Sequence, residues 1–146
     1  MDAAWIGLVG AVAGAGIALL GQYIVARTGR REREIALLLD QCAYIIAFSE
    51  DFRNRVWEER RLDREGRVAE WDIGAYRIAE AKLLILNTGK SFGEAIGELR
   101  KRGADLGVAW RTERADNEKI EAAWWAHHRA LKAFTEASAT LVKRRR

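Results

Sequence analysis

A long uncharged segment stands near the start of the chain. From Ala3 to Ala26 there are 24 residues without a charged side chain. As a helix rising about 1.5 Å per residue, this segment would span about 36 Å. That length exceeds the roughly 30 Å of a bilayer's hydrocarbon core. Trp5 and Tyr23 lie near its two ends, where aromatic side chains meet lipid headgroups. The pattern predicts a transmembrane anchor within residues 1–29.

Four apolar stripes with helical spacing follow the uncharged segment. In the first, the steps alternate between three and four, which places the residues on one helix face. Its members are Ile35, Leu38, Cys42, Ile45, Ser49, Phe52 and Val56, and Leu39 and Ile46 broaden it into a core face. The other stripes predict helices over residues 68–86, from 92 onward and from 116 or 117 onward. The inward residues expected on the third helix are Phe92, Ile96, Leu99, Leu106 and Trp110. Those expected on the fourth are Ile120, Trp124, His127, Leu131, Phe134, Ser138 and Leu141. Because the joins are short, the sequence predicts an all-α fold, with an antiparallel four-helix bundle over residues 30–146.

The predicted helices carry signals at their ends and on their faces. Asn-Thr-Gly at residues 87–89 predicts a stop, and Ser91 with Glu94 predicts a capping box for the third helix. Asp116 or Asn117 is expected to cap the fourth helix. The inward face expected for the second helix contains Trp71, Ala75, Ile78 and Ile85. The third helix contains four glycines, each costing up to about 1 kcal/mol against alanine, so we expect it to be the least stable.

Glycines follow a pattern within the uncharged segment. Gly7, Gly14 and Gly21 are spaced seven residues apart, and Gly10 forms a G-x-x-x-G motif with Gly14. All four fall on one face of a helix. Small residues allow two helix backbones to approach closely in lipid. The pattern therefore predicts a homo-oligomer that packs through this face.

Basic residues flank the uncharged segment on one side. The preceding side carries Asp2, whereas the following side carries Arg27, Arg30, Arg31 and Arg33. The positive-inside rule then predicts a single-pass protein of the plasma membrane, with its N-terminus outside and its helical domain in the cytoplasm. The fourth helix of an up-down bundle returns to the membrane side. We therefore expect a second basic group to join the first at anionic lipid headgroups, although it would also complement a helix C-terminus. This second group is Lys143, Arg144, Arg145 and Arg146.

The uncharged segment has two other interpretations. A cleaved signal peptide needs a basic region first, but only Met1 and Asp2 precede the apolar run. A helix that is apolar on all sides is also found buried in protein. The alternative that stays open is therefore a subunit of a larger assembly, in which this helix is covered by other chains.

Composition limits the function classes. The chain contains no proline, where average usage would give about seven, which favours uninterrupted helices. The net charge of +4 equals the charge of the last four residues, so the basicity is local and no nucleic acid is expected as a partner. The single cysteine, Cys42, excludes an internal disulfide. Because it lies on an apolar stripe, we expect a buried and inert thiol.

No residue constellation predicts catalysis, a cofactor or a metal. Gly-Lys-Ser at residues 89–91 resembles the end of a P-loop, but Leu84 stands where the motif needs glycine. His127 and His128 lack the Glu-x-x-His spacing of a helical di-iron site, and we expect a partly buried pair. The remaining carboxylates lie among arginines and are expected to form solvated ion pairs. These are Glu32, Glu34, Asp51, Glu58 and Glu59.

Tryptophan is the remaining signal, because exposed tryptophans anchor protein interfaces. Trp57 and Trp125 are the candidate interface residues. They predict a non-enzymatic interaction or scaffold protein that recruits a protein partner at the cytoplasmic membrane surface. A phage-type holin, lysis or superinfection-exclusion protein is the alternative from another class.

The overall layout resembles the many small, uncharacterised single-pass membrane proteins of actinobacteria and their phages. The resemblance lies in Gly7–Ala26, in the Arg-Thr-Gly-Arg-Arg-Glu-Arg run at residues 27–33, and in a helical domain with a basic end. It implies a single-pass architecture and no particular activity.

Overall fold

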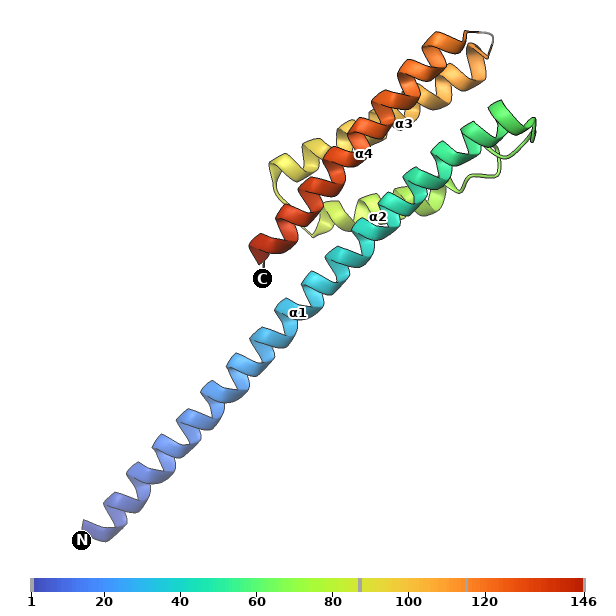
Figure 1. The fold of residues 1–146 in the computed structure, drawn as a ribbon. Coiled ribbons are helices and arrows are strands. Elements are labelled where there is room, and N and C mark those ends of the chain that lie inside the picture. The colour runs from blue at the N-terminus through green and yellow to red at the C-terminus, as the bar shows by residue number, and fades with distance from the viewer. Residues whose placement is uncertain (1, 87, 115, 146) are drawn as a thin grey trace. The chain divides into compact units, whose positions relative to one another are not determined.

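The computed structural model consists of helices over the residues that it describes (Figure 1). It describes the backbone of residues 2–86, 88–114 and 116–145, and the same side chains except those of residues 2–21 and 24. The helices are α1 (Asp2–Leu62), α2 (Ile73–Ile85), α3 (Lys90–Thr112) and α4 (Asn117–Arg145). No strand occurs within those ranges. The predicted all-α class is confirmed.

Two compact units divide the chain, Met1–Ala36 and Leu37–Arg146. Helix α1 passes through both without a break at Gly29. Most of the predicted anchor lies outside the described side chains, and so does its whole glycine face: Gly7, Gly10, Gly14 and Gly21. Within the part of the chain that the structure does describe, no helix is both long enough and apolar enough to cross a membrane.

The second unit is a helical bundle whose core contains the stripe predicted on α1. Ile35, in the first unit, is half-buried. The other six residues of that stripe are buried: Leu38, Cys42, Ile45, Ser49, Phe52 and Val56. Leu39, which was expected to broaden the face, is exposed instead, and Gln41 and Arg53 are buried. The heptad spacing therefore predicted the central line of the face but not its edges.

The prediction for α2 was wrong at its start and in its face. Residues 68–71 precede the helix as a turn, and Asp72 caps α2 by accepting a 3.0 Å hydrogen bond from the Ala75 backbone N–H. Trp71, the first residue of the expected face, lies before the helix, where it packs against the core and its indole N–H donates to the Phe48 carbonyl at 3.0 Å. Ala75 is half-buried, whereas Ile78 and Ile85 are exposed. The buried residues are Tyr76, Ala79, Glu80 and Leu83.

Helices α3 and α4 pack closely against each other, as neighbours joined by a short turn must (Figure 1). The rings of Phe92 on α3 and Phe134 on α4 lie 5.3 Å apart between centroids. Every apolar residue predicted to face inward on α3 is buried: Phe92, Ile96, Leu99, Leu106 and Trp110. On α4 the prediction is confirmed at Ile120, His127, Leu131, Phe134 and Ser138, whereas Trp124 and Leu141 are half-buried.

The predicted cap of α4 is confirmed, and that of α3 is corrected. The Asp116 carboxylate accepts a 3.1 Å hydrogen bond from the Lys119 backbone N–H at the start of α4. Helix α3 begins at Lys90, one residue before the expected serine cap, and follows Gly89, whose φ is 88°. A positive φ favours glycine, because it has no Cβ to clash with the backbone. Gly89 therefore sets the turn into α3, and Ser91 lies inside the helix.

Candidate functional site

The two tryptophans predicted as interface residues lie at the same groove on the second unit. Trp57 comes from α1 and Trp125 from α4, and each side chain is 47% exposed. Both line a groove of about 190 Å³ that also contains Val56, Ile120 and Trp124. The structure thus brings together two residues that are 68 positions apart in the sequence, which spacing alone did not predict. We call this feature the tryptophan groove.

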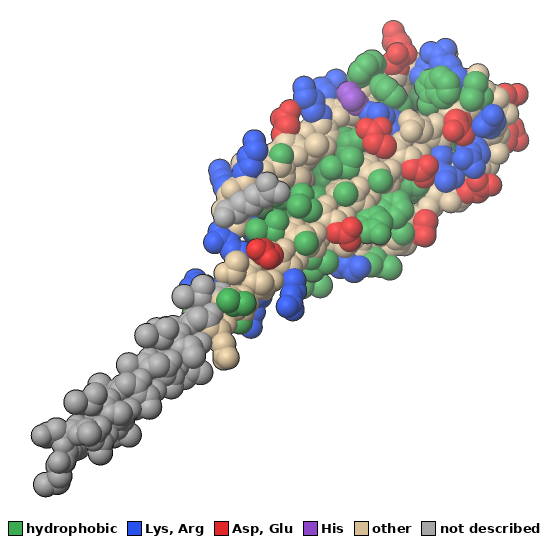
Figure 2. Space-filling model, turned by 60° about the horizontal axis from the view of Figure 1, so that its bottom comes forward, with side chains coloured by type: hydrophobic (Ala, Val, Ile, Leu, Met, Phe, Trp, Pro, Cys, Tyr) green, Lys and Arg blue, Asp and Glu red, His purple; other side chains and the backbone are tan. Residues whose placement is uncertain are grey.

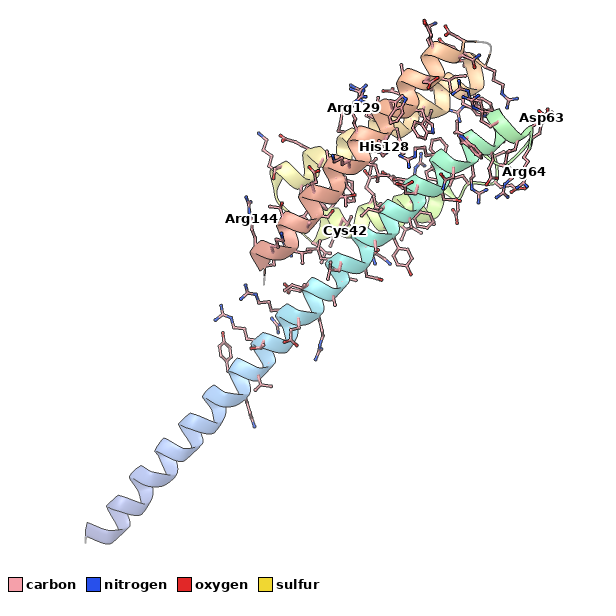
Figure 3. The ribbon with its side chains drawn as sticks, in the orientation of Figure 1. Cys42, Asp63, Arg64, His128, Arg129 and Arg144 are labelled. Carbon is pink, nitrogen blue, oxygen red and sulfur yellow. The ribbon has the colours of Figure 1, made fainter. Side chains whose placement is uncertain are left out.

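An aromatic and basic stack supports the tryptophan groove from behind. The ring of Trp124 lies edge-on to Trp125, 5.0 Å between centroids, and stacks on His128 at 6.1 Å. The guanidinium of Arg53 lies 4.8 Å from the Trp124 ring centre. Arg53 also donates to Nδ1 of His128, which α4 carries beside Arg129 (Figure 3), and to Glu50 at 2.5 Å. These contacts connect α1 to α4 and hold the base of the groove.

Glu59 was expected to form a solvated ion pair, but the structure buries its side chain. Its side chain is only 4% exposed. One carboxylate oxygen accepts from the Val68 backbone N–H at 2.8 Å, and the other accepts from the Trp110 indole N–H at 2.6 Å. Arg114 lies 3.6 Å from the same carboxylate and 4.8 Å from the Trp110 ring centre. Glu59 therefore joins α1, the turn before α2, and α3, and its role is structural.

A larger cavity of about 520 Å³ lies among α1, the turn at residues 68–71, α2, α3 and α4. Its apolar wall includes Phe52, Val68, Trp71, Ile73 and Leu99. Basic side chains line it as well, at Arg77, Arg100, Lys101 and Arg111. The sequence did not predict this cavity, because it depends on the turn that holds Trp71 outside α2.

Three buried polar side chains in the cavity lining have an atom without a hydrogen-bond partner among the described residues. They are the Ser49 hydroxyl, the Tyr76 hydroxyl and Nδ1 of His127. Burial, together with the nearby Arg53 and His128, lowers the pKa of His127 to about 4. Burial also raises the pKa of Tyr76, with Glu80 adding to the shift and Arg100 opposing it. All three groups are therefore neutral at pH 7.

Two glycines of α3 explain part of the cavity's shape. A Cβ added at Gly103 would lie 3.7 Å from the His127 ring, and one added at Gly107 would lie 3.5 Å from the Phe52 ring. Both distances are ordinary van der Waals contacts, so an alanine side chain would fit at either position, whereas a larger side chain would meet the ring. From the sequence, these glycines were predicted only to lower the stability of the third helix. In the structure they form one wall of the cavity.

The basic residues expected at a membrane surface fall in both units. Arg27, Arg30, Arg31 and Arg33 belong to the first unit. Lys143, Arg144 and Arg145 belong to the second, where Arg145 donates to the Leu86 carbonyl at 3.3 Å, and Arg146 lies outside the described residues. Because the two groups are in separate units, their proximity stays a prediction.

The thiol of Cys42 is buried on α1, as expected (Figure 3). Burial raises its pKa, and a hydrogen bond with Ser138 opposes part of that shift. The thiolate, which is the reactive form, is therefore scarce at pH 7. Among the side chains that the structure describes, no group of three or more His, Cys, Asp or Glu is placed to hold a metal ion.

The fold and its two hollows define an all-α helical bundle with a tryptophan-lined surface groove and a mostly apolar cavity with a basic lining. Comparisons with protein-family models, with curated proteins and with solved structures found no match. The function is therefore argued from the groove, the cavity and the sequence pattern.

Proposed function

We propose that this protein is a non-enzymatic, membrane-anchored interaction protein. Its uncharged segment, Ala3–Ala26, spans the plasma membrane, and its glycine face packs against a second copy of the chain. An antiparallel four-helix bundle follows in the cytoplasm and presents the tryptophan groove to a protein partner. Support for the membrane part comes from the sequence: 24 residues without a charge, followed by Arg27, Arg30, Arg31 and Arg33.

The observation that carries the proposed recruitment is the pairing of Trp57 and Trp125 at one groove. Tryptophan dominates the binding energy of many protein interfaces when it lies at a pocket with a well-packed base. Here the base is held by Arg53, Trp124 and His128. Small-molecule pockets have volumes of about 300–1,000 Å³. A groove of about 190 Å³ suits one or two side chains of a protein partner better.

Charged residues border the same groove. Arg60 and Arg61 of α1 lie on one side, and Glu121 of α4 lies 3.6 Å from Arg60. Exposed rim charges of this kind affect the association rate and the choice of partner more than the affinity. The groove thus has the apolar centre and the charged rim of a protein interface.

Site-specific photo-crosslinking in cells tests the recruitment. A photoreactive phenylalanine analogue is placed at position 57 or 125, where it replaces one aromatic side chain with another. The matched control is position 132, an exposed lysine of α4 that does not line the groove. The proposal expects one discrete adduct of the same size from both groove positions and none from position 132. Absence of an adduct at both groove positions, or equal labelling at all three, would contradict it.

A further inference from the structure

The large cavity has polar groups that no other part of the described bundle satisfies. Ser49, Tyr76 and His127 come from three different helices and are 2%, 6% and 2% exposed, respectively. Each has a polar atom without a hydrogen-bond partner among the described residues. A buried polar group without a partner costs roughly 1–3 kcal/mol. Three such groups along one cavity therefore indicate that something else enters it.

The charges along the cavity favour an anion. The lining contains four basic residues, Arg77, Arg100, Lys101 and Arg111, and one acidic residue, Glu80. Glu80 lies 3.4 Å from Arg100, so this pair is neutralised internally. Arg77, Lys101 and Arg111 are exposed. Exposed lining residues lie on the solvent side of the cavity, and no acid of the lining is left to balance these three cations.

The interior of the cavity favours an aromatic body. The rings of Phe52 and Trp71 lie 4.8 Å apart between centroids, and Trp71 lies 5.7 Å from Tyr76. Aromatic side chains at such distances offer faces and edges on which another ring can stack. The volume, about 520 Å³, falls within the range of about 300–1,000 Å³ in which proteins hold small molecules.

We propose that this cavity binds a small organic anion with an aromatic body. The ring occupies the cavity and packs against lining residues that include Phe52, Trp71 and Gly103. The anionic group stays at the opening, near Arg77, Lys101 and Arg111. Apart from Glu80, whose charge Arg100 neutralises, the buried polar groups of the lining are neutral. An anion in the interior would lose its hydration without gaining an unpaired cation. An uncharged polar substituent on the inner end of the ring meets Ser49, Tyr76 or His127.

A direct binding measurement tests this proposal on the full chain. The probe is a fluoronaphthoate observed by fluorine NMR, with the corresponding fluoronaphthamide as its neutral counterpart and protein-free buffer as the blank. The proposal expects the naphthoate to bind saturably to one site per chain. It expects the naphthamide to bind about tenfold more weakly, because the amide lacks the charge that the opening recognises.

Two variants assign the binding to the cavity. Reversing two exposed cations, Lys101→Glu with Arg111→Glu, is expected to weaken naphthoate binding by about tenfold or more, since repulsion replaces attraction. Gly103→Leu places a side chain against the His127 ring and is expected to abolish binding. The matched controls are Lys132→Glu, a charge reversal outside the cavity lining, and Ile78→Ser on the exposed face of α2. Both controls are expected to bind the naphthoate as the wild type does.

Three outcomes would overturn the proposal. They are absence of saturable naphthoate binding to the wild type, equal binding of naphthoate and naphthamide, and full binding by the Lys101 and Arg111 double variant. Loss of binding in Ile78→Ser with full binding in Gly103→Leu would place the probe on the exposed face of α2 and would overturn it too. Circular dichroism checks that each variant folds. If Gly103→Leu does not fold, the charge reversal at exposed positions still decides.

Discussion

At the residue scale, His127 couples the stability of the bundle to pH. Its side chain is buried, and burial together with Arg53 and His128 lowers its pKa from the ordinary 6.5 to about 4. Above pH 6.5 the ring is neutral in both the folded and the unfolded chain and adds no pH dependence. As the pH falls below 6.5, the unfolded chain binds a proton that the folded chain does not, so stability falls until pH 4.

The expected size of this effect follows from the lowering of the His127 pKa from 6.5 to about 4, which corresponds to about 3 kcal/mol. Between pH 7 and pH 4, the free energy of unfolding should fall in both proteins. We expect the fall to be larger by this amount in the wild type than in the His127→Gln variant. Urea unfolding followed by tryptophan fluorescence at both pH values measures the difference. Carboxylates elsewhere titrate in both proteins and therefore cancel. Equal losses of stability in the two proteins would show that His127 is not held neutral by the fold.

Glu59 gives a second prediction at the same scale. Replacing it with alanine leaves the Trp110 indole N–H and the Val68 backbone N–H without their acceptor. We expect Glu59→Ala to lower the free energy of unfolding by about 2–4 kcal/mol. Asp51→Ala is the matched control, because Asp51 is a half-buried acid of the same helix whose side chain is 47% exposed and pairs with Arg55 at 2.7 Å. The control should cost less than about 1 kcal/mol. Similar costs for both variants would contradict the structural role of Glu59.

At the scale of helices, the sequence predicted spacing better than boundaries. The stripe on α1 and the inward face of α3 were predicted from periodicity alone, because each lies within one uninterrupted helix. The face of α2 was not, because Trp71 looks like its first apolar residue but belongs to the turn before it. Counting the helix from Trp71 rather than from Ile73 therefore placed the wrong residues on the inward face of α2.

The corrected face of α2 is testable by a matched pair of substitutions. Leu83 is fully buried, so Leu83→Ala is expected to cost about 2–5 kcal/mol of unfolding free energy through lost contacts and a cavity. Ile78 is 60% exposed, so Ile78→Ala is expected to cost within about 0.5 kcal/mol. Thermal and urea unfolding of both variants provide the comparison. A larger cost at Ile78 than at Leu83 would restore the face predicted from the sequence and contradict the observed one.

The same face also leaves hydrophobic side chains on the surface of the second unit. Ile73, Ile78, Leu84 and Ile85 of α2 are all more than half exposed. Figure 2 shows hydrophobic side chains on the surface of this unit, between acidic and basic ones. Scattered apolar residues are ordinary on protein surfaces. Within the proposed function, the tryptophan groove differs from them because two large aromatic residues share one concave site.

At the scale of the whole molecule, the sequence predicted residues of one candidate site, the tryptophan groove, but not the other, the cavity. Trp57 and Trp125 were selected from the sequence because tryptophan is typical of interfaces, and the structure places them at one groove. The cavity was not predicted, because it needs the turn at residues 68–71, two glycines of α3 and polar residues of three helices together. Groups that meet only through tertiary packing leave no spacing signal in the sequence.

In the proposed function, Ala3–Ala26 anchors the chain in a membrane and its glycine face brings copies together. The most direct test is to fractionate cells that express the full chain, wash the membranes with carbonate and crosslink them. We expect the wild type to stay in the membrane pellet and to form a dimer or a higher ladder.

Substitutions on the uncharged segment separate the anchor from its packing face. Gly10→Ile and Gly14→Ile should reduce the ladder without releasing the protein from the membrane. Gly16→Ile is the matched control, because 3.6 residues per turn place Gly16 on the opposite side of a helix, and it should leave the ladder unchanged. A wild-type protein that is soluble, or that carbonate removes from the membranes, would contradict the anchor and the function proposed with it.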